Sequence, residues 1–374
     1  VIVSRALEYK ATAVGLSALL VSTSQQMPLV VESLHAHGKK IPVLIGGAAI
    51  NNAFAERISI TKNNIPYQGG VFYCRDAFDA LEVLNGRIET PDSSPVILKG
   101  NKPENHRMVN QSQRSSGMPK EHIIPNPPFW GPRLLSEINL ENLFNIINQS
   151  ALFRVSWGAR NAKGEQWKKY KSQFSEMLFA MRDRLQREPW LKASALYGFW
   201  PCNADGDDLI IYDARQSEHK ELVRFTLPRQ TNNKRLCLSD YFAPLGSNQV
   251  DVAAFQIVTL GQASTEYVHH LQEIGEIADA FYAHGLAVQL TEAAAKFIHS
   301  RIRDDLFLEK AQGKRYSWGF PAIPDLSQHE MLFKFLPAEK ELGIRMTSAF
   351  QFIPEYTTAA LILHHEDAEY FRMG

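Results

Sequence analysis

Apolar runs alternate with helical stretches across residues 1–90, and this alternation constrains the fold more than any other feature of the chain. Residues 13–20 (AVGLSALL) and 41–45 are nearly continuous apolar runs, as in strands buried on both faces of a parallel sheet. A helical stretch over residues 26–37 separates the two runs. We therefore predict the second half of a doubly wound, flavodoxin-like α/β domain in this part of the chain.

Small and hydroxyl-bearing residues lie where these predicted strands end. Ser17 and Thr23 lie near the end of the first predicted strand, and Gly46 and Gly47 follow the second. Doubly wound sheets bind ligands at the carboxyl ends of their strands. A pair of glycines there either lets the backbone approach a bulky ligand or makes a tight turn into the next helix. The sequence leaves both interpretations of the glycine pair open.

The pattern changes after residue 90. Residues 91–128 are rich in proline, asparagine and serine, which predicts an extended linker. Residues 129–374 combine hairpin-type strands with separate helices, which predicts an α+β domain with a twisted antiparallel sheet and long helices. Strands are expected at residues 195–200, 209–212, 222–227, 252–260, 346–352 and 359–363. Helices are expected at residues 139–151, 174–187 and 265–306, the last one interrupted near Gly285.

Residues 313–325 (GKRYSWGFPAIPD) are the strongest candidate for a binding segment in the second domain. The segment combines Arg315 with the aromatic residues Tyr316, Trp318 and Phe320, and two prolines. A rigid, irregular backbone that carries a cation and aromatic rings suits a flat or charged ligand such as a nucleoside. The alternative is a surface loop that two aromatic side chains anchor.

The overall composition excludes several classes of partner. Forty basic residues balance forty acidic ones, so we expect no binding to nucleic acid or to an anionic membrane. No apolar run reaches the roughly 18 residues that a membrane span needs. The three cysteines are scattered without CxxC spacing, which predicts reduced thiols and a cytoplasmic setting. The chain opens on Val1 inside a helical pattern, so we expect it to be part of a longer protein.

Three polar clusters are candidates for metal sites, and each has a simpler interpretation. Asp205, Asp207 and Asp208 fit an exposed hairpin turn better than a metal site, because no histidine lies beside them. The pair at 364–365 and the helix histidines at 35 and 37 are expected to be structural. We therefore predict no metal ligands in this chain.

Several segments, taken in order, resemble one family. They are VGLSALLVSTSQQM, IPVLIGGAAI, VFYCRDAFDAL, LYGFWPCNADGDDLIIY, DVAAFQIVT, QLTEAAAKFIHSRIR, GKRYSWGFPAIPD and LILHHEDAEYF. Their order resembles the C-terminal part of the cobalamin-dependent methionine synthases. The resemblance implies half of a cobalamin-binding domain at 1–90, a linker at 91–128, and an activation domain that binds S-adenosyl-L-methionine at 129–374.

The resemblance also implies site residues for cobalamin. The matching positions around the nucleotide tail of the cofactor are Ser17, Thr23, Gly46, Gly47, Tyr73 and Ala77. Small residues and hydroxyls there would make room for the inserted base and hydrogen-bond it. The family's Asp-x-His-x-x-Gly segment, which supplies the histidine ligand of cobalt, belongs before Val1, and no such segment occurs in this chain.

For S-adenosylmethionine, the matching positions are Asn148, Glu309, Arg315, Tyr316 and Phe320. Arg315 matches an arginine whose guanidinium suits the methionine carboxylate. Glu309 matches an acidic residue suited to the amine or the ribose hydroxyls. Asn148 replaces an aspartate that usually meets the amine, Phe320 replaces a tyrosine, and Ser300 replaces a glutamate. These departures predict a changed affinity for the ligand.

The resemblance implies a methyltransferase of methionine biosynthesis that moves a methyl group from 5-methyltetrahydrofolate to homocysteine through methylcobalamin. This part would serve the reductive remethylation of cob(II)alamin, with an electron from a flavodoxin-type or other reductase. The homocysteine module, with its zinc, and the folate module would lie in the N-terminal part that is missing here. The alternative is a stand-alone, non-catalytic subunit for reactivation or corrinoid binding, which an upstream reading frame would exclude.

Overall fold

The computed structural model describes residues 2–18, 21–24, 26–47, 50–75, 77–89, 123–215, 220–231, 234–309 and 312–371. The chain divides into two compact units, Val1–Asn110 with Met346–Gln351, and Gln111–Arg345 with Phe352–Gly374. Asp76 and residues 91–122 of the predicted linker lie outside the described residues. Among the helices in the described ranges, none combines the length and the apolar character that a bilayer crossing requires.

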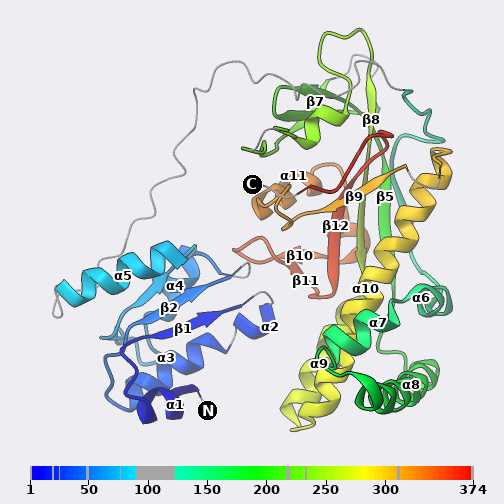
Figure 1. The fold of residues 1–374 in the computed structure, drawn as a ribbon. Coiled ribbons are helices and arrows are strands. Elements are labelled where there is room, and N and C mark those ends of the chain that lie inside the picture. Colours follow the sequence, from blue (N-terminus) through cyan, green and yellow to red (C-terminus); the bar gives the residue numbers. More distant parts are fainter. Residues whose placement is uncertain are drawn as a thin grey trace. The chain divides into compact units, whose positions relative to one another are not determined.

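The first unit contains a parallel sheet of three strands in the order β1-β2-β3 (Figure 1). The strands are β1 (Val14–Ser17), β2 (Val43–Gly46) and β3 (Val71–Tyr73). The helices are α1 (Ile2–Glu8), α2 (Val21–Ser24), α3 (Met27–Ala36), α4 (Asn52–Ile58) and α5 (Ala77–Glu89). The alternation of strands and helices that the apolar runs predicted is confirmed in this unit.

The strands of the first unit are less buried than expected. Val14, Val43 and Ile45 are buried in one core, but Gly15 and Ser17 on the other face of β1 are exposed. Side chains alternate between the two faces of a strand, so the apolar run buries one face of β1 and leaves the other open. The prediction of a strand buried on both faces was therefore wrong for β1.

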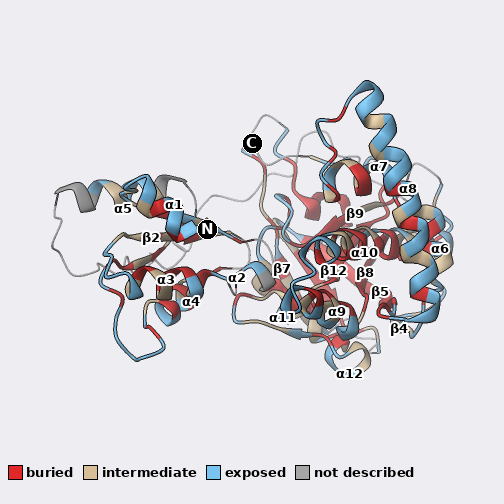
Figure 2. Ribbon diagram, turned by 90° about the horizontal axis from the view of Figure 1, so that it is seen from below, coloured by how far each residue is buried: buried red, intermediate tan, exposed pale blue. Residues whose placement is uncertain are grey.

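The second unit is built on a seven-stranded antiparallel sheet in the order β7-β6-β5-β8-β12-β9, with β4 also paired to β5. The strands are β4 (Gly131–Leu135), β5 (Ser194–Asp205), β6 (Asp208–Tyr212), β7 (Glu221–Thr226), β8 (Asp251–Thr259), β9 (Lys314–Ser317) and β12 (Thr357–Leu363). The central strands are almost wholly buried, as their red colour in Figure 2 shows. The predicted antiparallel sheet is confirmed.

Helices and short connecting elements complete the second unit. The α-helices are α6 (Leu140–Ile146), α7 (Gln149–Ala151), α8 (Gly164–Arg187), α9 (Gln262–Glu273), α10 (Ile277–Asp305), α11 (His329–Phe333) and α12 (Ala338–Leu342). The remaining elements are a π-helix at Leu152–Ser156 and 3-10 turns at Leu238–Tyr241 and Leu326–Gln328. The paired strands β10 (Arg345–Met346) and β11 (Phe352–Ile353) lie at the two ends of the segment Met346–Gln351, which is assigned to the first unit.

Alternation along β5 and β8 gives the sheet two different apolar faces. Tyr197 and Phe199 of β5 belong to the core that the buried side of α10 completes. Trp200 points to the opposite face, where its ring lies 4.8 Å from that of Phe335 and 5.7 Å from that of Phe255. The sheet is therefore covered on both sides, with α10 packed along one of them (Figure 1).

Several local expectations for the second unit were wrong. The segment at 313–325 is not irregular throughout, because pairing with β12 turns its first part into strand β9. The single strand expected at 346–352 is instead the β10–β11 pair. The helix expected at 139–151 is broken at Ile147, and α8 begins ten residues before the predicted start at 174.

The interruption of the long helix lies at Gly275, where φ is 84°, and not at Gly285 as predicted. Gly285 instead allows a close contact in the middle of α10. A Cβ atom there would lie 2.8 Å from Cδ1 of Trp157, whose indole N–H donates to the Tyr282 carbonyl at 3.0 Å. The glycine is required for side-chain packing and does not end the helix.

We expect Gly285→Ala to lower the free energy of unfolding by about 1–3 kcal/mol, because the buried indole of Trp157 would have to shift. This loss outweighs the gain of about 1 kcal/mol that alanine brings to a helix interior. Urea unfolding followed by tryptophan fluorescence measures the difference. Ser300→Ala, at an exposed position of the same helix, is the control, and equal stability of the two variants would contradict the packing argument.

Candidate functional site

A cavity of about 400 Å³ in the second unit brings charged side chains of both signs together. Its lining residues are Ile146, Asn148, Gln289, Glu292, Ala293, Lys296, His299, Arg315 and Tyr370. The five lining residues from α10 follow one another at helical spacing, so they share one face of that helix. The cavity thus lies where this polar face of α10 meets edge strand β9.

Arg315 is the most buried cation of this cavity, and one of its hydrogen-bond donors has no partner among the described residues. It is the second residue of β9 and pairs with Ile362 in β12, so the sheet fixes its backbone. Its side chain is 17% exposed, and Nη2 donates to Oε2 of Glu292 at 2.6 Å. Nη1 is buried and has no hydrogen-bond partner among the described residues. A buried, unpaired donor is costly, so this geometry favours an acceptor from a bound ligand.

Glu292 also lines the cavity, although it is not among the binding residues predicted from the sequence. Its side chain is 51% exposed, and it lies one helical turn before Lys296 on α10. From the sequence alone, Glu292 and Lys296 could equally well form an ordinary ion pair on a solvent-exposed face of the helix. The signal that distinguishes Glu292 is its contact with Arg315, 23 residues away, which depends on the packing of β9 beside α10.

His299 contributes a neutral imidazole to the cavity. Burial, together with the nearby charges of Arg315 and Arg303, lowers the pKa of His299 to about 4. The ring makes a hydrogen bond to the Gly313 backbone, and its Nε2 atom is buried without a partner among the described residues. At neutral pH, the cavity therefore presents an uncharged ring nitrogen beside a guanidinium.

We expect His299 to make the second unit less stable in acid. Its folded-state pKa of about 4 lies below the ordinary value of 6.5, so protons bind the unfolded state more readily. This contribution to stability is complete above pH 6.5 and is lost as the pH falls toward 4. The free energy of unfolding of the wild type should therefore fall as the pH is lowered from about 7 to about 5. In His299→Gln, this fall should be smaller by about 2 kcal/mol.

Urea unfolding at the two pH values, followed by tryptophan fluorescence, measures this effect. His270→Gln on α9 is the matched control, because His270 is exposed and lies outside the cavity. An unchanged pH dependence in the His299 variant would show that the buried imidazole does not titrate as its surroundings require.

Asn148 lies in the same cavity as Arg315, and its side chain already has a structural task. Its Oδ1 atom accepts a hydrogen bond from the Ala151 amide at 3.0 Å and so caps α7. Its amide nitrogen can donate to a ligand, and its oxygen keeps a second lone pair besides the one used in the cap. Asn148 can therefore bind either an acceptor or a donor group of a ligand while it caps α7.

The other predicted ligand-binding residues of this unit do not line the cavity. Glu309 is exposed, and its backbone N–H donates to Gln312 in a local turn. Tyr316 is buried and donates to the Glu369 carbonyl. Phe320 is 58% exposed in the turn after β9. Of the five predicted positions, the structure thus brings Asn148 and Arg315 together.

The predicted positions of the first unit gather at one edge of its sheet. Ser17, Gly46 and Tyr73 end three neighbouring parallel strands, and Ser17 is directly paired with Gly46. Thr23 lies in α2 with its side chain exposed, and Ala77 is the first residue of α5. The common position of the strand ends is the geometry that ligand-binding edges of parallel sheets share.

The glycine pair of the first unit is required by the chain itself. A Cβ atom at Gly47, where φ is 102°, would lie 2.3 Å from the Ala18 carbonyl oxygen. A Cβ atom at Gly46 would lie 2.7 Å from the Cys74 carbonyl oxygen. Backbone packing therefore explains both glycines, which favours the tight-turn interpretation of the pair.

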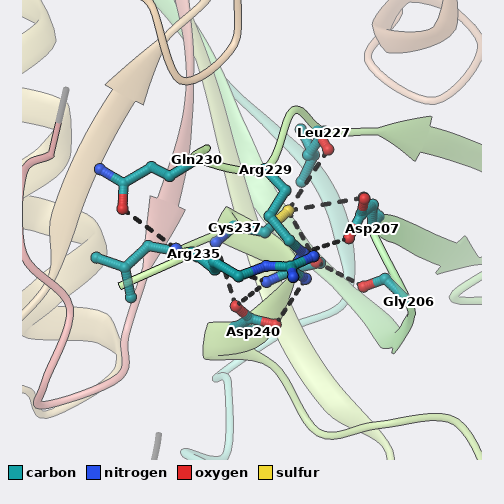
Figure 3. Close-up of polar contacts among 10 residues, drawn as sticks. Gly206, Asp207, Leu227, Arg229, Gln230, Arg235, Cys237 and Asp240 are labelled. Carbon is teal, nitrogen blue, oxygen red and sulfur yellow. Dashed lines mark hydrogen bonds and ion pairs between the residues drawn. The ribbon is translucent and has the colours of Figure 1, made fainter. Parts of the chain in front are cut away.

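The acidic turn between β5 and β6 is occupied by arginines. Arg224 binds Asp205 and Asp208 at 2.7 and 3.2 Å on the surface. Figure 3 shows Arg229 between Asp207 and Asp240, which it contacts at 2.7 and 2.6 Å. Within the described ranges, no group of acidic, histidine or cysteine side chains has the arrangement of a metal site. The three aspartates thus organise a hairpin turn.

Comparison with known proteins agrees with this fold. Residues 139–374 match the family model described as "Vitamin B12 dependent methionine synthase, activation domain". Two curated relatives are the methionine synthases of Mycobacterium tuberculosis (30% identical) and Mycobacterium leprae (28% identical), each over 97% of this chain. The chain spans about a third of their length, 35% and 34% respectively.

A solved structure shares the architecture. It is titled "Crystal Structure of the MetH Reactivation Domain bound to AdoHcy", and it superposes with a TM-score of 0.60 at 23% sequence identity. The match covers 68% of this chain and 84% of that one. This likeness shows a common fold for the mixed helices and antiparallel sheet.

Proposed function

The chain belongs to the family of vitamin B12-dependent methionine synthase activation domains, and from that membership we propose that its second unit binds S-adenosylmethionine in the cavity between α10 and β9. The observation that carries the proposal is the buried, unpartnered Nη1 of Arg315. An arginine held by a sheet, with one donor satisfied and another free, suits a carboxylate. The ligand has such a carboxylate on its methionine portion.

The remaining lining residues fit a ligand with both polar and apolar parts. Ile146 and Ala293 offer apolar contacts, and Gln289 offers an amide whose nitrogen donates to Ser156 at 3.2 Å. The neutral His299 adds no further positive charge to the cavity that would repel a sulfonium. The bound thioether that the structural neighbour's title names is the demethylated form of the same ligand.

The role of this binding is to serve a larger methyltransferase, such as the methionine synthases of which this chain spans about a third. We propose that the chain presents S-adenosylmethionine for the reductive remethylation of cob(II)alamin, so that methionine synthesis from 5-methyltetrahydrofolate and homocysteine can continue. A flavodoxin-type or other reductase would supply the electron. The modules for homocysteine and folate would be further parts of the same protein.

We further propose that the first unit, with residues 1–90, is part of a cobalamin-binding domain. The aligned strand ends at Ser17, Gly46 and Tyr73 support this role. The Ser17 and Thr23 hydroxyls are exposed and free to bond the nucleotide tail, and the space above Gly15 is open. The corrinoid, when bound, supplies the methyl-carrying chemistry, and these residues hold and orient its tail.

Isothermal titration calorimetry of the 374-residue chain with S-adenosylmethionine and with S-adenosylhomocysteine tests the main proposal. We expect one binding site for each ligand, in competition with the other. Heats no larger than those of dilution, with a chain shown to be folded by circular dichroism, would contradict the proposal. Adenosine serves as the control for binding that does not involve the amino-acid portion.

A further inference from the structure

Another cavity of the second unit, of about 250 Å³, lies on the face of the sheet that is turned away from α10. Along one edge of β5, residues 195–199 pair with β4 and residues 202–205 pair with β6, while β8 pairs along the other edge. Neither β4 nor β6 pairs with Trp200 or Pro201, and the cavity lies at this interruption. The apolar side chains that line it include Pro132, Trp200, Leu222, Phe335 and Pro337.

The indole N–H of Trp200 is a donor without a protein acceptor. Trp200 is 2% exposed, and its side chain makes no hydrogen bond to any described residue. A buried indole N–H usually has a partner, because an unpaired buried donor is costly. Since Trp200 lines the cavity, an acceptor on a bound ligand can supply the missing partner.

Lys334 gives this cavity its net positive charge. It directly follows α11, is exposed, and forms no ion pair with a described residue. The other two charged lining residues neutralise each other, because Nε and Nη2 of Arg215 donate to the two carboxylate oxygens of Asp213 at 3.0 and 3.1 Å. The cavity therefore favours an anion over a cation.

The size and the walls of the cavity restrict the ligand further. Sites for drug-sized ligands have volumes of roughly 300–1,000 Å³, so this smaller cavity suits a compact metabolite. The rings of Trp200 and Phe335 lie 4.8 Å apart in an edge-to-face arrangement, and a further aromatic ring packs well against such walls. A carboxylate can accept from an indole N–H and from an ammonium at the same time.

We propose that this cavity is a ligand site that binds a small aromatic carboxylate. The carboxylate accepts from Nε1 of Trp200 and from Nζ of Lys334, and the aromatic ring packs against Phe335 and Leu222. The cavity shares no lining residue with the one that contains Arg315. Binding there therefore does not depend on whether the chain binds S-adenosylmethionine.

The probes are hydrocinnamate and hydrocinnamide, which has the same shape without the charge. Each is titrated into the 374-residue chain carrying ¹⁵N-labelled tryptophan, and the indole N–H signals are followed by NMR. Trp200→Phe keeps an aromatic ring and identifies the Trp200 signal, by its loss, among those of the six tryptophans. Lys334→Met tests the charge. Lys340→Met on α12, whose side chain is 82% exposed and lies outside the cavity, is the matched control.

We expect hydrocinnamate to shift the Trp200 signal in a saturable way. Lys334→Met should weaken its binding about 10-fold or more, because hydrogen bonds between charged groups contribute about that factor. Hydrocinnamide should bind the wild type and Lys334→Met with the same affinity, within about 2-fold. Lys340→Met should bind both probes as the wild type does.

A Trp200 signal that stays in place at about 10 mM hydrocinnamate would overturn the proposal, since even a ligand with a Kd of about 1 mM would then be largely bound. Unchanged binding of hydrocinnamate by Lys334→Met would overturn it as well. An equal loss for both probes would show that this variant changes the shape of the cavity and not its charge, and would also count against the proposal. Displacement of hydrocinnamate by S-adenosylhomocysteine would place the acid in the cavity of Arg315 and leave the proposed function intact.

Discussion

Replacing Arg315 with alanine is expected to weaken binding of S-adenosylmethionine by about 2–4 kcal/mol, the range for truncating one partner of a buried charge pair. The guanidinium is largely buried, and a sheet strand fixes its backbone. Little freedom is therefore lost when a carboxylate binds. The alanine variant would leave the ligand carboxylate with no cation at this depth of the cavity.

Two further variants make the result specific. Arg315→Lys should recover part of the affinity, since an ammonium cannot reproduce the paired fork of a guanidinium. Arg187→Ala, on the exposed face of α8, is a control that should bind as wild type does. Calorimetry with the fold checked by circular dichroism decides the matter. Unchanged affinity in the Arg315 alanine variant would place the ligand elsewhere.

The second large effect concerns stability, and it lies in the ion pairs of the β5–β6 turn. Arg229→Met is expected to lower the free energy of unfolding by about 3–5 kcal/mol, because it leaves a buried charge without its partner. The side chains of Arg229 and Asp240 are 6% and 0% exposed, and two hydrogen bonds join them. Because the Arg229–Asp240 pair is buried, breaking it should lower the free energy of unfolding far more than breaking a surface ion pair.

Arg224→Met is the matched control for Arg229→Met. Arg224 also binds two aspartates of the same turn, but its side chain is 33% exposed and that of Asp205 is 50% exposed. Such a pair contributes about 0–1 kcal/mol. Urea unfolding followed by fluorescence reports on the second unit, which holds all six tryptophans. Similar losses in the two variants would contradict the role assigned to burial.

A second substitution separates pairing from packing. If the cost of Arg229→Met is the unpaired charge, then Arg229→Met combined with Asp240→Leu should recover most of the lost stability. Asp240 also accepts from the Cys237 amide, so a small loss should remain. A double variant as unstable as the single one would indicate that packing of the arginine stem matters more.

The elements that local pattern determines could be predicted from the sequence. The apolar runs indicated β1 and β2, and the helical stretch expected at 26–37 is α3, which Gly38 follows with a φ of 63°. The turn at Asp205-Gly206 joins β5 to β6. In these places, the spacing of apolar side chains and the turn-forming residues determine the structure, and both are local features of the sequence.

Features that depend on distant contacts could not be predicted in this way. Lys314–Ser317 forms a strand because β12 pairs with it, and no local propensity indicates that pairing. The glycine at 285 within α10 leaves room for Trp157, which lies more than a hundred residues earlier in the chain, and the local sequence does not indicate that contact. The place of Glu292 in the cavity also depends on a distant contact, because its partner Arg315 belongs to strand β9.

The order of strands in the second unit determines how late its cavity can form. β12 is the last strand of the sheet along the chain, yet it lies between β8 and β9 and joins them. During synthesis, β9, which carries Arg315, can therefore pair with the rest of the sheet only after residues 357–363 have been made. Such long-range closure slows folding. Losing those seven residues would remove an internal strand, and the arginine would lose its place beside α10.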